Sequence, residues 1–320
     1  MRAYAIERRG TIADLRVMEL PRPVPAANEL LVRVRAAALN PADLKVLAGR
    51  DGGGFLHATN FPFALGFDFS GVVESVGAAA TGYVAGDEVF GFLPYARSTR
   101  GGSFAEYLAV AADSVGKKPK MLSHEEAASA ATAAMTALCA LREKGRLAAG
   151  QTVLINGASG GVGSYAVQIA RNLGANVLAI ASAAKADAVK SLGASQVYDY
   201  KATPISEIKT QVEMVLDVAS NSTFGACLHL LKPGGSYVSL LPSPAMFLGM
   251  ARALFSSRRC AFVMVKPHAS DFAEIARWFD EGKLKPMLER SYPFNELPIA
   301  LERLQRGDVR GKLALTVDAG

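Results

Sequence analysis

The sequence predicts an α/β protein in which a doubly wound parallel sheet is combined with a second, mainly β domain. Three observations lead to this prediction. Apolar strand-like segments alternate with helical ones between residues 123 and 262, a pattern typical of parallel strands covered by helices on both faces. A glycine-rich turn joins one of these strands to the helix that follows it. Short strand-like segments broken by glycine and proline fill residues 1–122, as in a small barrel or sandwich.

The first 122 residues contain several segments with the composition of short strands, and one short helix. The helix candidate is PADLKVLAG, in which Pro41 suits the first helical position because an N–H there has no intrahelical partner. The last strand candidate of the chain, KLALTV, suits this domain better than the centre of a parallel sheet. We therefore expect a discontinuous domain built from residues 1–122 and 263–320. Its other strand candidates are LLVRVRAAAL, FSGVVESVG, EVFGF and GSFAEYLAV.

Residues 123–262 alternate between helix and strand in the order of a dinucleotide-binding domain. An Ala-rich helix opens this region with a serine followed by glutamates, a recognisable helix start. The strand candidates are TVLIN, NVLAIA, SQVYDY, VEMVLDVA and YVSLLP, and the helix candidates are GGVGSYAVQIARNLG, KADAVKSLG and FGACLHLLKPGG. A strand, AFVMV, and two helices, DFAEIARWFDEG and ELPIALERLQRG, lead back to KLALTV.

Composition and charge narrow the classes of partner and location. The formal charge is +6, but the basic residues are spread along the chain, whereas a nucleic-acid-binding protein usually has a clustered basic patch. We therefore expect no nucleic-acid partner. Cys139, Cys227 and Cys260 include no C-x-x-C pair, which indicates free thiols in a reducing compartment. Because no apolar signal core and no run long enough to span a bilayer is present, a cytoplasmic location is expected.

The stretch TVLINGASGGVGSYAVQIA is the most informative part of the sequence. The predicted strand ends at Asn156, and the predicted helix begins near Gly161. Glycines in the turn between them allow backbone N–H groups to approach a pyrophosphate, and the helix N-terminus adds partial positive charge. The second strand, NVLAIA, follows at the distance that a βαβ unit requires. The predicted cofactor-binding residues of this turn are Gly157, Ser159, Gly160, Gly161, Val162 and Gly163.

The end of the second strand predicts which dinucleotide binds. NAD sites usually carry an Asp or Glu there, which accepts a hydrogen bond from the ribose 2′-hydroxyl. Residues 177–182 contain no acid, and Ser182 and Lys185 instead offer a hydroxyl and a cation that suit a 2′-phosphate. NADPH is therefore the predicted cofactor. Asp187 is expected to lie on a solvated helix face.

With these motifs in view, the chain resembles the medium-chain dehydrogenase/reductase superfamily, in its zinc-independent quinone-oxidoreductase branch. The resemblance implies a Rossmann domain together with a GroES-like catalytic domain formed by both chain ends, usually in a homodimer. It extends over essentially the whole length, because the characteristic segments occur in the family's order: LNPADLKVLAG, GFDFSGVVESVG, GDEVFGF, GGSFAEYLAV, AATAAMTALCAL, GASGGVG, LGASQVYDY, LKPGGSYVSL and GKLALTV.

The resemblance also implies roles for individual residues. By motif match, Ser182, Lys185 and Tyr200 would surround the adenosine 2′-phosphate, and Asn40 and Thr136 would lie near the nicotinamide. Tyr200 could equally be a core aromatic at the end of a strand. Thr136 could be a helix hydroxyl that bonds to its own backbone.

The ligands that zinc alcohol dehydrogenases of this superfamily use are missing. Where those enzymes have a Cys and a Gly-His-Glu, this chain has Asn40-Pro41-Ala42-Asp43 and Gly66-Phe67-Asp68. The four-cysteine structural lobe is also missing. The histidines show no ligand spacing, so a metal-free site is expected, and alcohol oxidation would lack its Lewis acid. These histidines are His57, His124, His229 and His268.

A metal-free site that holds NADPH can reduce an acceptor that is already electrophilic, namely a quinone or an α,β-unsaturated carbonyl. The developing oxyanion then needs stabilisation and a proton. The catalytic candidates are Lys45, Asn40 and Asp43. Lys45 stands where many quinone oxidoreductases have a Tyr, and burial would lower its pKa toward the range of a proton donor. It could also be an ordinary surface lysine, Asp43 could cap a helix, and solvent could supply the proton.

Two other functions and one unusual segment stay open. The chain could be an enoyl-thioester reductase, or a noncatalytic NADPH-binding sensor or interaction protein. Residues 243–259, SPAMFLGMARALFSSRR, are apolar and Met-rich and then basic. This segment could be buried at a dimer interface, line a tunnel for a lipophilic substrate, or contact a membrane surface.

Overall fold

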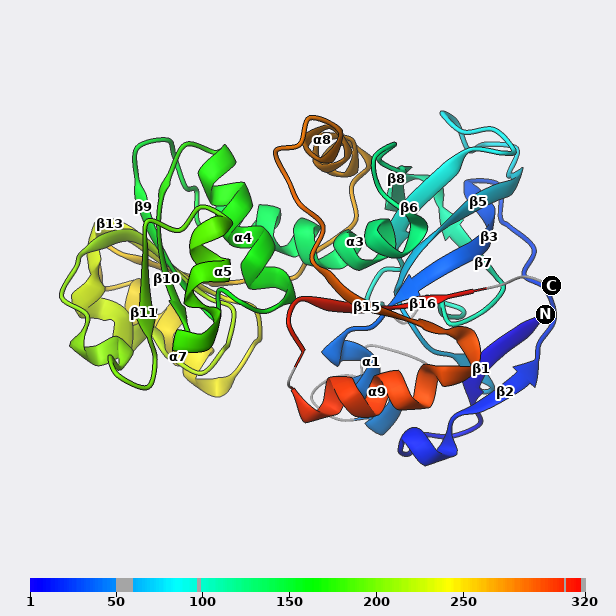
Figure 1. Ribbon diagram of the computed structural model, residues 1–320, viewed down its shortest axis with the longest axis horizontal. Helices are drawn as coiled ribbons and strands as arrows, with labels where there is room; N and C mark the ends of the chain where they lie inside the picture. The colour runs from blue at the N-terminus through cyan, green and yellow to red at the C-terminus, as the bar shows by residue number, and fades with distance from the viewer. Residues whose placement is uncertain (50–59, 97–98, 308, 318–320) are drawn as a thin grey trace. The chain divides into compact units, whose positions relative to one another are not determined.

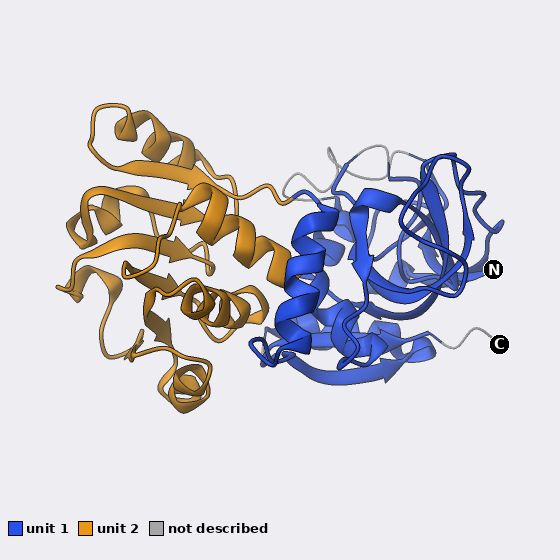
Figure 2. Cartoon of the chain, turned by 90° about the horizontal axis from the view of Figure 1, so that it is seen from above, with its two compact units in different colours: residues 1–132, 266–320 blue, residues 133–265 orange. Residues whose placement is uncertain are grey.

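The computed structural model describes residues 1–49, 60–96, 99–307 and 309–317. The chain forms two compact units, which Figure 2 distinguishes by colour: unit 1 comprises Met1–Thr132 and Lys266–Gly320, and unit 2 comprises Ala133–Val265. The border after Thr132 lies ten residues later than the border expected at residue 122. It falls within one helix, α3 (His124–Leu138), which belongs partly to each unit. The predicted fold class is confirmed, since unit 2 contains a parallel sheet and unit 1 is mainly antiparallel β.

Unit 1 is built on two sheets. In the larger, seven-stranded sheet, β16 at the end of the chain pairs antiparallel with β3, and β3 pairs with β5 on its other side (Figure 1). Buried side chains of these strands form the core of the unit, among them Val32, Phe69 and Leu315. The large sheet contains β3 (Glu29–Ala38), β5 (Asp68–Val76), β6 (Glu88–Phe92), β7 (Tyr107–Ala111), β8 (Val115–Lys117), β15 (Leu288–Pro293) and β16 (Lys312–Thr316), and the small one contains β1 (Arg2–Ile6), β2 (Arg16–Glu19) and β4 (Phe63–Ala64).

Short helices cover the sheets of unit 1. Helix α8 packs on β8 so closely that a Cβ at Gly116 would lie 2.5 Å from the Cβ of Phe272. Helix α9 contacts α1, and the left-handed Gly49 ends α1 with φ 66°, a conformation that glycine adopts without strain. The helices of this unit besides α3 are α1 (Pro41–Ala48), α8 (Ala269–Asp280) and α9 (Leu297–Arg306), with the 3₁₀ turns Ile12–Asp14, Ala112–Ser114 and Phe294–Glu296.

Unit 2 is a six-stranded parallel sheet in the order β11-β10-β9-β12-β13-β14. The strand order reverses between β9 and β12, and dinucleotides bind at such a reversal, outside the carboxyl ends of the strands. Helix α4 packs against β9 and β10, α5 against β10 and β11, and α7 against β14. The strands are β9 (Thr152–Asn156), β10 (Asn176–Ala181), β11 (Gln196–Asp199), β12 (Val212–Asp217), β13 (Leu231–Ser239) and β14 (Arg259–Phe262).

The helical segments of unit 2 differ from expectation in two ways: helix α7 was not among the predicted helices, and one predicted helix is cut short. The sequence predicts one helix over FGACLHLLKPGG, but α6 (Phe224–Cys227) and a 3₁₀ turn end at Leu230, and β13 begins at Leu231. Pro233 has no N–H for a helix, and Gly234 has φ 79°, so the chain cannot continue helically. The other helical segments are a π-helical end of α3 (Cys139–Lys144), α4 (Gly161–Asn172), α5 (Ala186–Ser191) and α7 (Pro244–Ala253), with 3₁₀ turns at Ala183–Lys185 and Ile205–Glu207.

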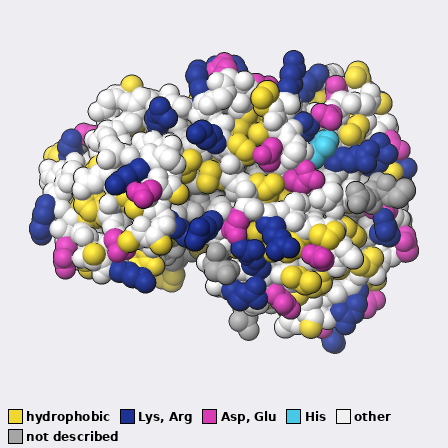
Figure 3. All heavy atoms as spheres, in the orientation of Figure 1, with side chains coloured by type: hydrophobic (Ala, Val, Ile, Leu, Met, Phe, Trp, Pro, Cys, Tyr) yellow, Lys and Arg dark blue, Asp and Glu magenta, His cyan; other side chains and the backbone are white. Residues whose placement is uncertain are grey.

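Figure 3 shows the charged side chains on one face of the molecule. Lysine and arginine side chains alternate there with aspartate and glutamate, and no large patch of a single sign is visible. In the described part of the chain, no helix has both the length and the hydropathy needed to cross a bilayer.

Candidate active site

The glycine-rich turn lies between β9 and α4, as predicted. Gly157 follows the last residue of β9 with φ 82°, which a residue with a side chain rarely adopts. The backbone N–H groups of Gly157 and Ala158 donate to the carbonyl oxygen of Ile180 at 3.2 and 3.1 Å. These bonds fix the turn to β10, and α4 then begins at Gly161.

Two glycines of this turn have different surroundings. A Cβ at Gly163 would lie 2.1 Å from the carbonyl oxygen of Gly157, so α4 can pack onto the turn only with glycine there. At Gly160 the nearest atom to such a Cβ lies 3.6 Å away, so this side of the turn is open. Ser159 and Val162 are partly exposed beside it. An open turn with helix N–H groups behind it fits the pyrophosphate of a dinucleotide.

The residues predicted around the adenosine 2′-phosphate lie together at the ends of β10 and β11. Ser182 directly follows β10, and Lys185 is three residues further on. The Tyr200 N–H donates to the carbonyl oxygen of Ala181 at 3.3 Å, which places Tyr200 beside Ser182. The Tyr200 side chain is 53% exposed, so it is not the core aromatic that the sequence also allowed. Among the described residues, the Ser182 hydroxyl and the Lys185 ammonium have no hydrogen-bond or ion-pair partner.

A buried polar network fixes the loop after β12 beside the glycine-rich turn. The Asp217 carboxylate, fully buried at the end of β12, accepts hydrogen bonds from the Asn156 side chain at 2.8 Å and from the Tyr237 hydroxyl at 2.8 Å. Asn156 also donates to the Asn221 side chain at 2.8 Å. A Cβ at Gly157 would lie 3.0 Å from the backbone nitrogen of Ala219. The loop and the turn therefore form one rigid support at the strand-order reversal. The sequence did not single out this network.

In unit 1, Asn40 is the centre of a second buried polar cluster. Asn40 precedes α1, and its side-chain nitrogen donates to Asp68 Oδ2 at 2.9 Å. The Lys312 ammonium, at the start of β16, donates to the Leu39 carbonyl oxygen at 2.9 Å and to Asn40 Oδ1, and lies 3.3 Å from Asp68 Oδ2. Asp68 is fully buried, and Lys312 is 6% exposed. A lysine and an aspartate thus neutralise each other and fix the orientation of the Asn40 amide.

The cluster continues from Asp68 toward a tyrosine. The Thr132 hydroxyl, on α3, donates to Asp68 Oδ1, and the Tyr95 hydroxyl is hydrogen-bonded to Thr132. The Tyr95 ring packs on Phe67, with ring centroids 4.4 Å apart. Tyr95 is partly exposed. Burial raises the pKa of Tyr95 well above its usual value, and the carboxylates of Asp68 and Asp43 add to the effect.

Asp43 lies in α1 under Asn40 and is fully buried. Its Oδ2 accepts a hydrogen bond from the Asn40 backbone N–H at 2.6 Å, which caps the helix, whereas its Oδ1 has no partner among the described residues. Burial raises the pKa of Asp43 to about 8, the Asn40 N–H opposes this, and the Asp68 carboxylate contributes to it. The helix-capping role that the sequence allowed for Asp43 is thus its observed contact.

Two predicted residues lie apart from these hydrogen bonds. Lys45 is partly exposed further along α1, and the cation that contacts Asn40 and Asp68 is Lys312 instead. Thr136 is buried on α3, one turn after Thr132, which is the threonine that contacts Asp68. Asp68, Thr132, Tyr95 and Lys312 were not predicted. A lysine that opens the apolar strand KLALTV was the available signal, because a buried lysine needs a partner.

No group of three or more His, Cys, Asp or Glu side chains is arranged to hold a metal ion in the described residues. His124 contacts the Ser70 hydroxyl at 2.8 Å and lies 3.4 Å from Glu88, and His57 lies outside the described residues.

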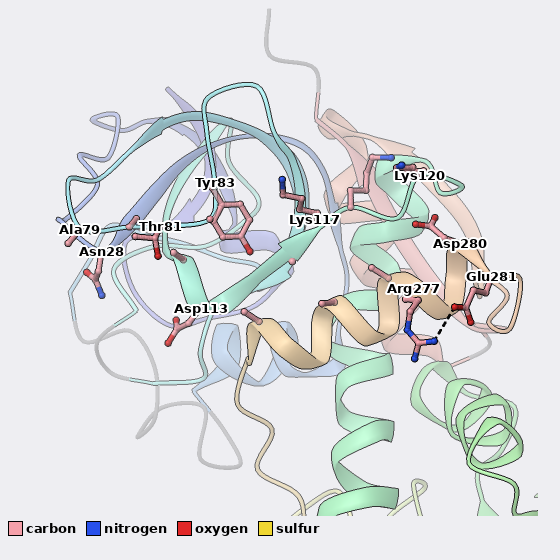
Figure 4. Close-up of a pocket in the computed structure, with 18 residues that line it drawn as sticks. Asn28, Ala79, Thr81, Tyr83, Asp113, Lys117, Lys120, Arg277, Asp280 and Glu281 are labelled. Carbon is pink, nitrogen blue, oxygen red and sulfur yellow. Dashed lines mark hydrogen bonds and ion pairs between the residues drawn. The ribbon is translucent and has the colours of Figure 1, made fainter.

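A groove of about 930 Å³ lies elsewhere in unit 1 (Figure 4). Alanines of α8 form part of its wall, and the labelled side chains around it carry both signs of charge, such as Lys117, Lys120, Asp113 and Asp280. None of the predicted site residues lines it, so it supports none of the predicted roles.

Comparison with known proteins gives family matches in both units. A model of the zinc-binding dehydrogenase family matches residues 192–315, and a model of the alcohol dehydrogenase GroES-like domain matches residues 26–120. The NAD(P)H oxidoreductase RTN4IP1 of Mus musculus mitochondria is 32% identical, over 99% of this chain and 89% of its own. The 2-methylene-furan-3-one reductase of Solanum lycopersicum is 31% identical, over 98% and 79%.

A solved structure shows the same likeness. The quinone oxidoreductase from Coxiella burnetii superposes with a TM-score of 0.87, at 30% identity and over 99% of both chains. The protein is therefore an oxidoreductase that uses a nicotinamide cofactor. Together with the two family models and the fold, these relatives show that the chain belongs to the medium-chain dehydrogenase/reductase superfamily, in its quinone-oxidoreductase branch.

Proposed function

We propose that the protein is an NADPH-dependent, zinc-independent reductase of quinones or α,β-unsaturated carbonyls. The observation that carries this proposal is the acid-free end of β10, where the Ser182 hydroxyl and the Lys185 ammonium have no hydrogen-bond or ion-pair partner in the described part of the chain. The open turn at Gly160 follows β9, the strand that pairs with β10. A 2′-phosphate would satisfy both groups with charge-assisted hydrogen bonds. The acceptor class is supported by the names of the tomato and Coxiella relatives.

The proposed roles divide between the residues of the two units. NADPH, when bound, supplies a hydride. The turn from Gly157 to Gly163 binds the pyrophosphate through backbone N–H groups, and Ser182, Lys185 and Tyr200 bind the 2′-phosphate. In unit 1, Lys312 and Asp68 orient the Asn40 amide, which uses one N–H for Asp68 and keeps the other for the oxygen of an acceptor.

Cofactor selectivity tests the first half of the proposal. Titration of the protein with NADPH and NADH, followed by nicotinamide fluorescence, should show tighter binding of NADPH. Lys185→Ala should weaken NADPH binding about tenfold, roughly the 1.4 kcal/mol of one charged contact, and leave NADH binding unchanged. Lys190→Ala is the matched control, because Lys190 is an exposed lysine of the neighbouring helix α5. Equal affinity for NADPH and NADH would contradict the proposal.

An acceptor screen tests the second half. NADPH consumption should be seen with 1,4-benzoquinone or with short 2-alkenals and enones. Consumption with crotonyl-CoA alone would indicate an enoyl-thioester reductase instead. Stoichiometric NADPH binding without consumption across the panel would indicate a noncatalytic sensor or interaction protein.

We also propose that the protein is a homodimer that works in the cytoplasm. The location is supported by the three free thiols. The dimer is supported by β14, an edge strand of its sheet, beside which the exposed α7 residues Phe247 and Leu248 form an apolar surface. Phe247 contacts Phe262 of β14, with ring centroids 6.1 Å apart. A second copy of the chain at this edge would pair with the backbone N–H and C=O groups on the outer side of β14. Residues 243–259 would then be buried at a dimer interface, one of the three roles that the sequence allowed.

The oligomeric state can be measured directly. Light scattering after gel filtration should give twice the chain mass, and Phe247→Glu should shift the protein toward the monomer. A monomeric wild-type protein that binds anionic vesicles through α7 would favour the membrane interpretation of this segment instead.

A further inference from the structure

We propose that Tyr95 is the proton donor of the reaction, held in place by a relay of Thr132 and Asp68. This inference rests on the proposed reduction of enones. It names the proton donor, which the sequence did not identify. Its basis is the chain of contacts that runs from the Lys312–Asp68 pair through Thr132 to Tyr95, a residue that is partly exposed.

The position of Tyr95 is set by contacts on two sides. Its ring lies against Phe67 at a centroid distance of 4.4 Å and against Phe92 at 6.4 Å, two side chains that are fully buried. Its hydroxyl is hydrogen-bonded to Thr132, and Thr132 donates to Asp68 Oδ1. A phenol fixed by aromatic packing at one end and by a hydrogen bond at the other has little freedom left to lose when it meets a substrate.

Other groups of the cluster are less suited to give a proton. The three hydrogens of the Lys312 ammonium are matched by the Leu39 carbonyl oxygen, Asn40 Oδ1 and Asp68 Oδ2. Asp68 and Asp43 are fully buried, and an amide such as Asn40 does not release a proton at neutral pH. Tyr95 alone in this cluster combines an acidic hydrogen with partial exposure.

The surroundings of Tyr95 keep it in the form that a donor needs. Burial and the negative charge of Asp68 raise its pKa, so the phenol holds its proton at neutral pH. The same carboxylate disfavours the phenolate that remains after transfer, and proton return from solvent is therefore favoured.

The proposed step balances as follows. When hydride adds to the β-carbon of an enone, the electron pair of the C=C bond moves to form an enolate. The Tyr95 hydroxyl gives up its hydrogen bond to Thr132 Oγ1, whose own hydrogen is donated to Asp68, and turns toward the enolate. The O–H bond of Tyr95 then breaks, its proton bonds to the enolate, and a phenolate remains until water returns the proton. The acceptor is reduced by two electrons, and the dihydronicotinamide is oxidised by two. A quinone differs, because hydride addition gives a hydroquinone anion that can leave without a proton from the protein.

This difference between acceptors gives the test. Tyr95→Phe keeps the ring and removes only the hydroxyl, so it should lower kcat for 3-penten-2-one about 100-fold, the usual contribution of a general acid. Turnover of 1,4-benzoquinone and the KM for NADPH should stay within twofold of wild type. Tyr83→Phe is the matched control, because the Tyr83 hydroxyl donates to the Val115 carbonyl oxygen in the same unit, at 2.8 Å, and it should leave both rates unchanged. Equal losses on both acceptors, or no loss on the enone, would overturn the assignment.

A binding measurement checks the same residue without turnover. With NADP⁺ present, 4-nitrophenol offers an oxyanion whose absorbance reports its ionisation, and the wild-type protein should bind the phenolate more tightly than Tyr95→Phe does. Equal binding to both proteins, or no binding to the wild type, would also count against Tyr95. If the wild type reduces neither acceptor, the proposed function fails, whereas the nitrophenol titration still decides whether Tyr95 donates to an oxyanion.

The relay provides a second set of variants should Tyr95→Phe not fold. Thr132→Val removes the hydroxyl between Tyr95 and Asp68, and Thr132→Ser restores it. Enone turnover should fall in the valine variant and return in the serine variant, while benzoquinone turnover stays level in both. Failure of serine to restore enone turnover would contradict the relay.

Discussion

The Lys312 ammonium lies 3.3 Å from the Asp68 carboxylate, although 244 residues separate the two in the chain. Lys312 opens β16 and Asp68 opens β5, and β3 lies between these strands in the sheet. The pair therefore joins the end of the chain to its first part at the place where Asn40 begins α1. The candidate acceptor site in unit 1 depends on the C-terminal strand as much as on the segment around Asn40.

Lys312→Met should destabilise the protein by about 3–5 kcal/mol, because it leaves the Asp68 carboxylate buried without its cation. Urea unfolding followed by circular dichroism measures this loss. Lys117→Met is the control, since Lys117 is 66% exposed in its ion pair with Asp87 and such pairs contribute at most about 1 kcal/mol. The double variant with Asp68→Asn should recover part of the loss. A loss no larger than that of Lys117→Met would show that the buried pair does not stabilise the fold.

The sequence predicted the turn at Gly157–Gly163 and the residues at the end of β10 because these features are local. A strand, a glycine turn and a helix occur in immediate succession, and each glycine is required by atoms within a few residues, such as Gly157 O next to Gly163. Ser182 and Lys185 follow from the same local pattern. The pattern of apolar segments also predicted the strands of unit 2 and most helices, but it missed β2, β4, β8 and β15 of unit 1 and helix α7 of unit 2.

The polar cluster of unit 1 could not be predicted in the same way. Lys312, Asp68 and Thr132 meet only after three distant segments have formed a sheet and a helix, and no spacing in one sequence encodes that meeting. Lys45 was a candidate because it stands where many quinone oxidoreductases have a Tyr. In the folded protein the lysine that donates to Asn40 Oδ1 is Lys312, at the start of β16.

A pair of alanine variants separates packing from cofactor binding in the glycine-rich turn. Gly163→Ala would bring a Cβ to 2.1 Å from Gly157 O, so it should lower the melting temperature strongly or prevent folding. Gly160→Ala meets only an ordinary contact at 3.6 Å, so it should fold normally but weaken NADPH binding about tenfold, roughly 1.4 kcal/mol. Thermal melts and fluorescence titration measure the two effects. Wild-type NADPH affinity in Gly160→Ala would mean that the pyrophosphate does not approach this residue.

Asp217→Ala should be costly although Asp217 forms no ion pair with any described residue. The change removes the acceptor of three N–H or O–H groups: one N–H of the Asn156 side chain, whose other N–H keeps its bond to Asn221, the Tyr237 hydroxyl and the Ser222 N–H. Each unsatisfied buried donor costs about 1–3 kcal/mol, so chemical denaturation should show a loss of several kcal/mol. Asp217→Asn keeps one acceptor oxygen and should lose less. If the alanine variant were as stable as the asparagine variant, water must replace the carboxylate.

Asp43 should make the protein less stable as the pH rises toward 8. Its pKa of about 8 in the folded protein lies above the ordinary 3.8, so between these values the folded state keeps a proton that the unfolded state has released. The free energy of unfolding therefore falls with rising pH, by at most about 1.4 kcal/mol per pH unit, and levels off above pH 8.

Asp43→Asn mimics the protonated acid and should remove this contribution. Denaturation from pH 5.5 to 8.5 measures it as the difference between wild type and Asp43→Asn, which cancels the contribution of other groups such as His124. Asp113→Asn, at an exposed position, should keep the wild-type pH dependence, and an unchanged slope in Asp43→Asn would show that Asp43 is ionised in the folded protein throughout this range.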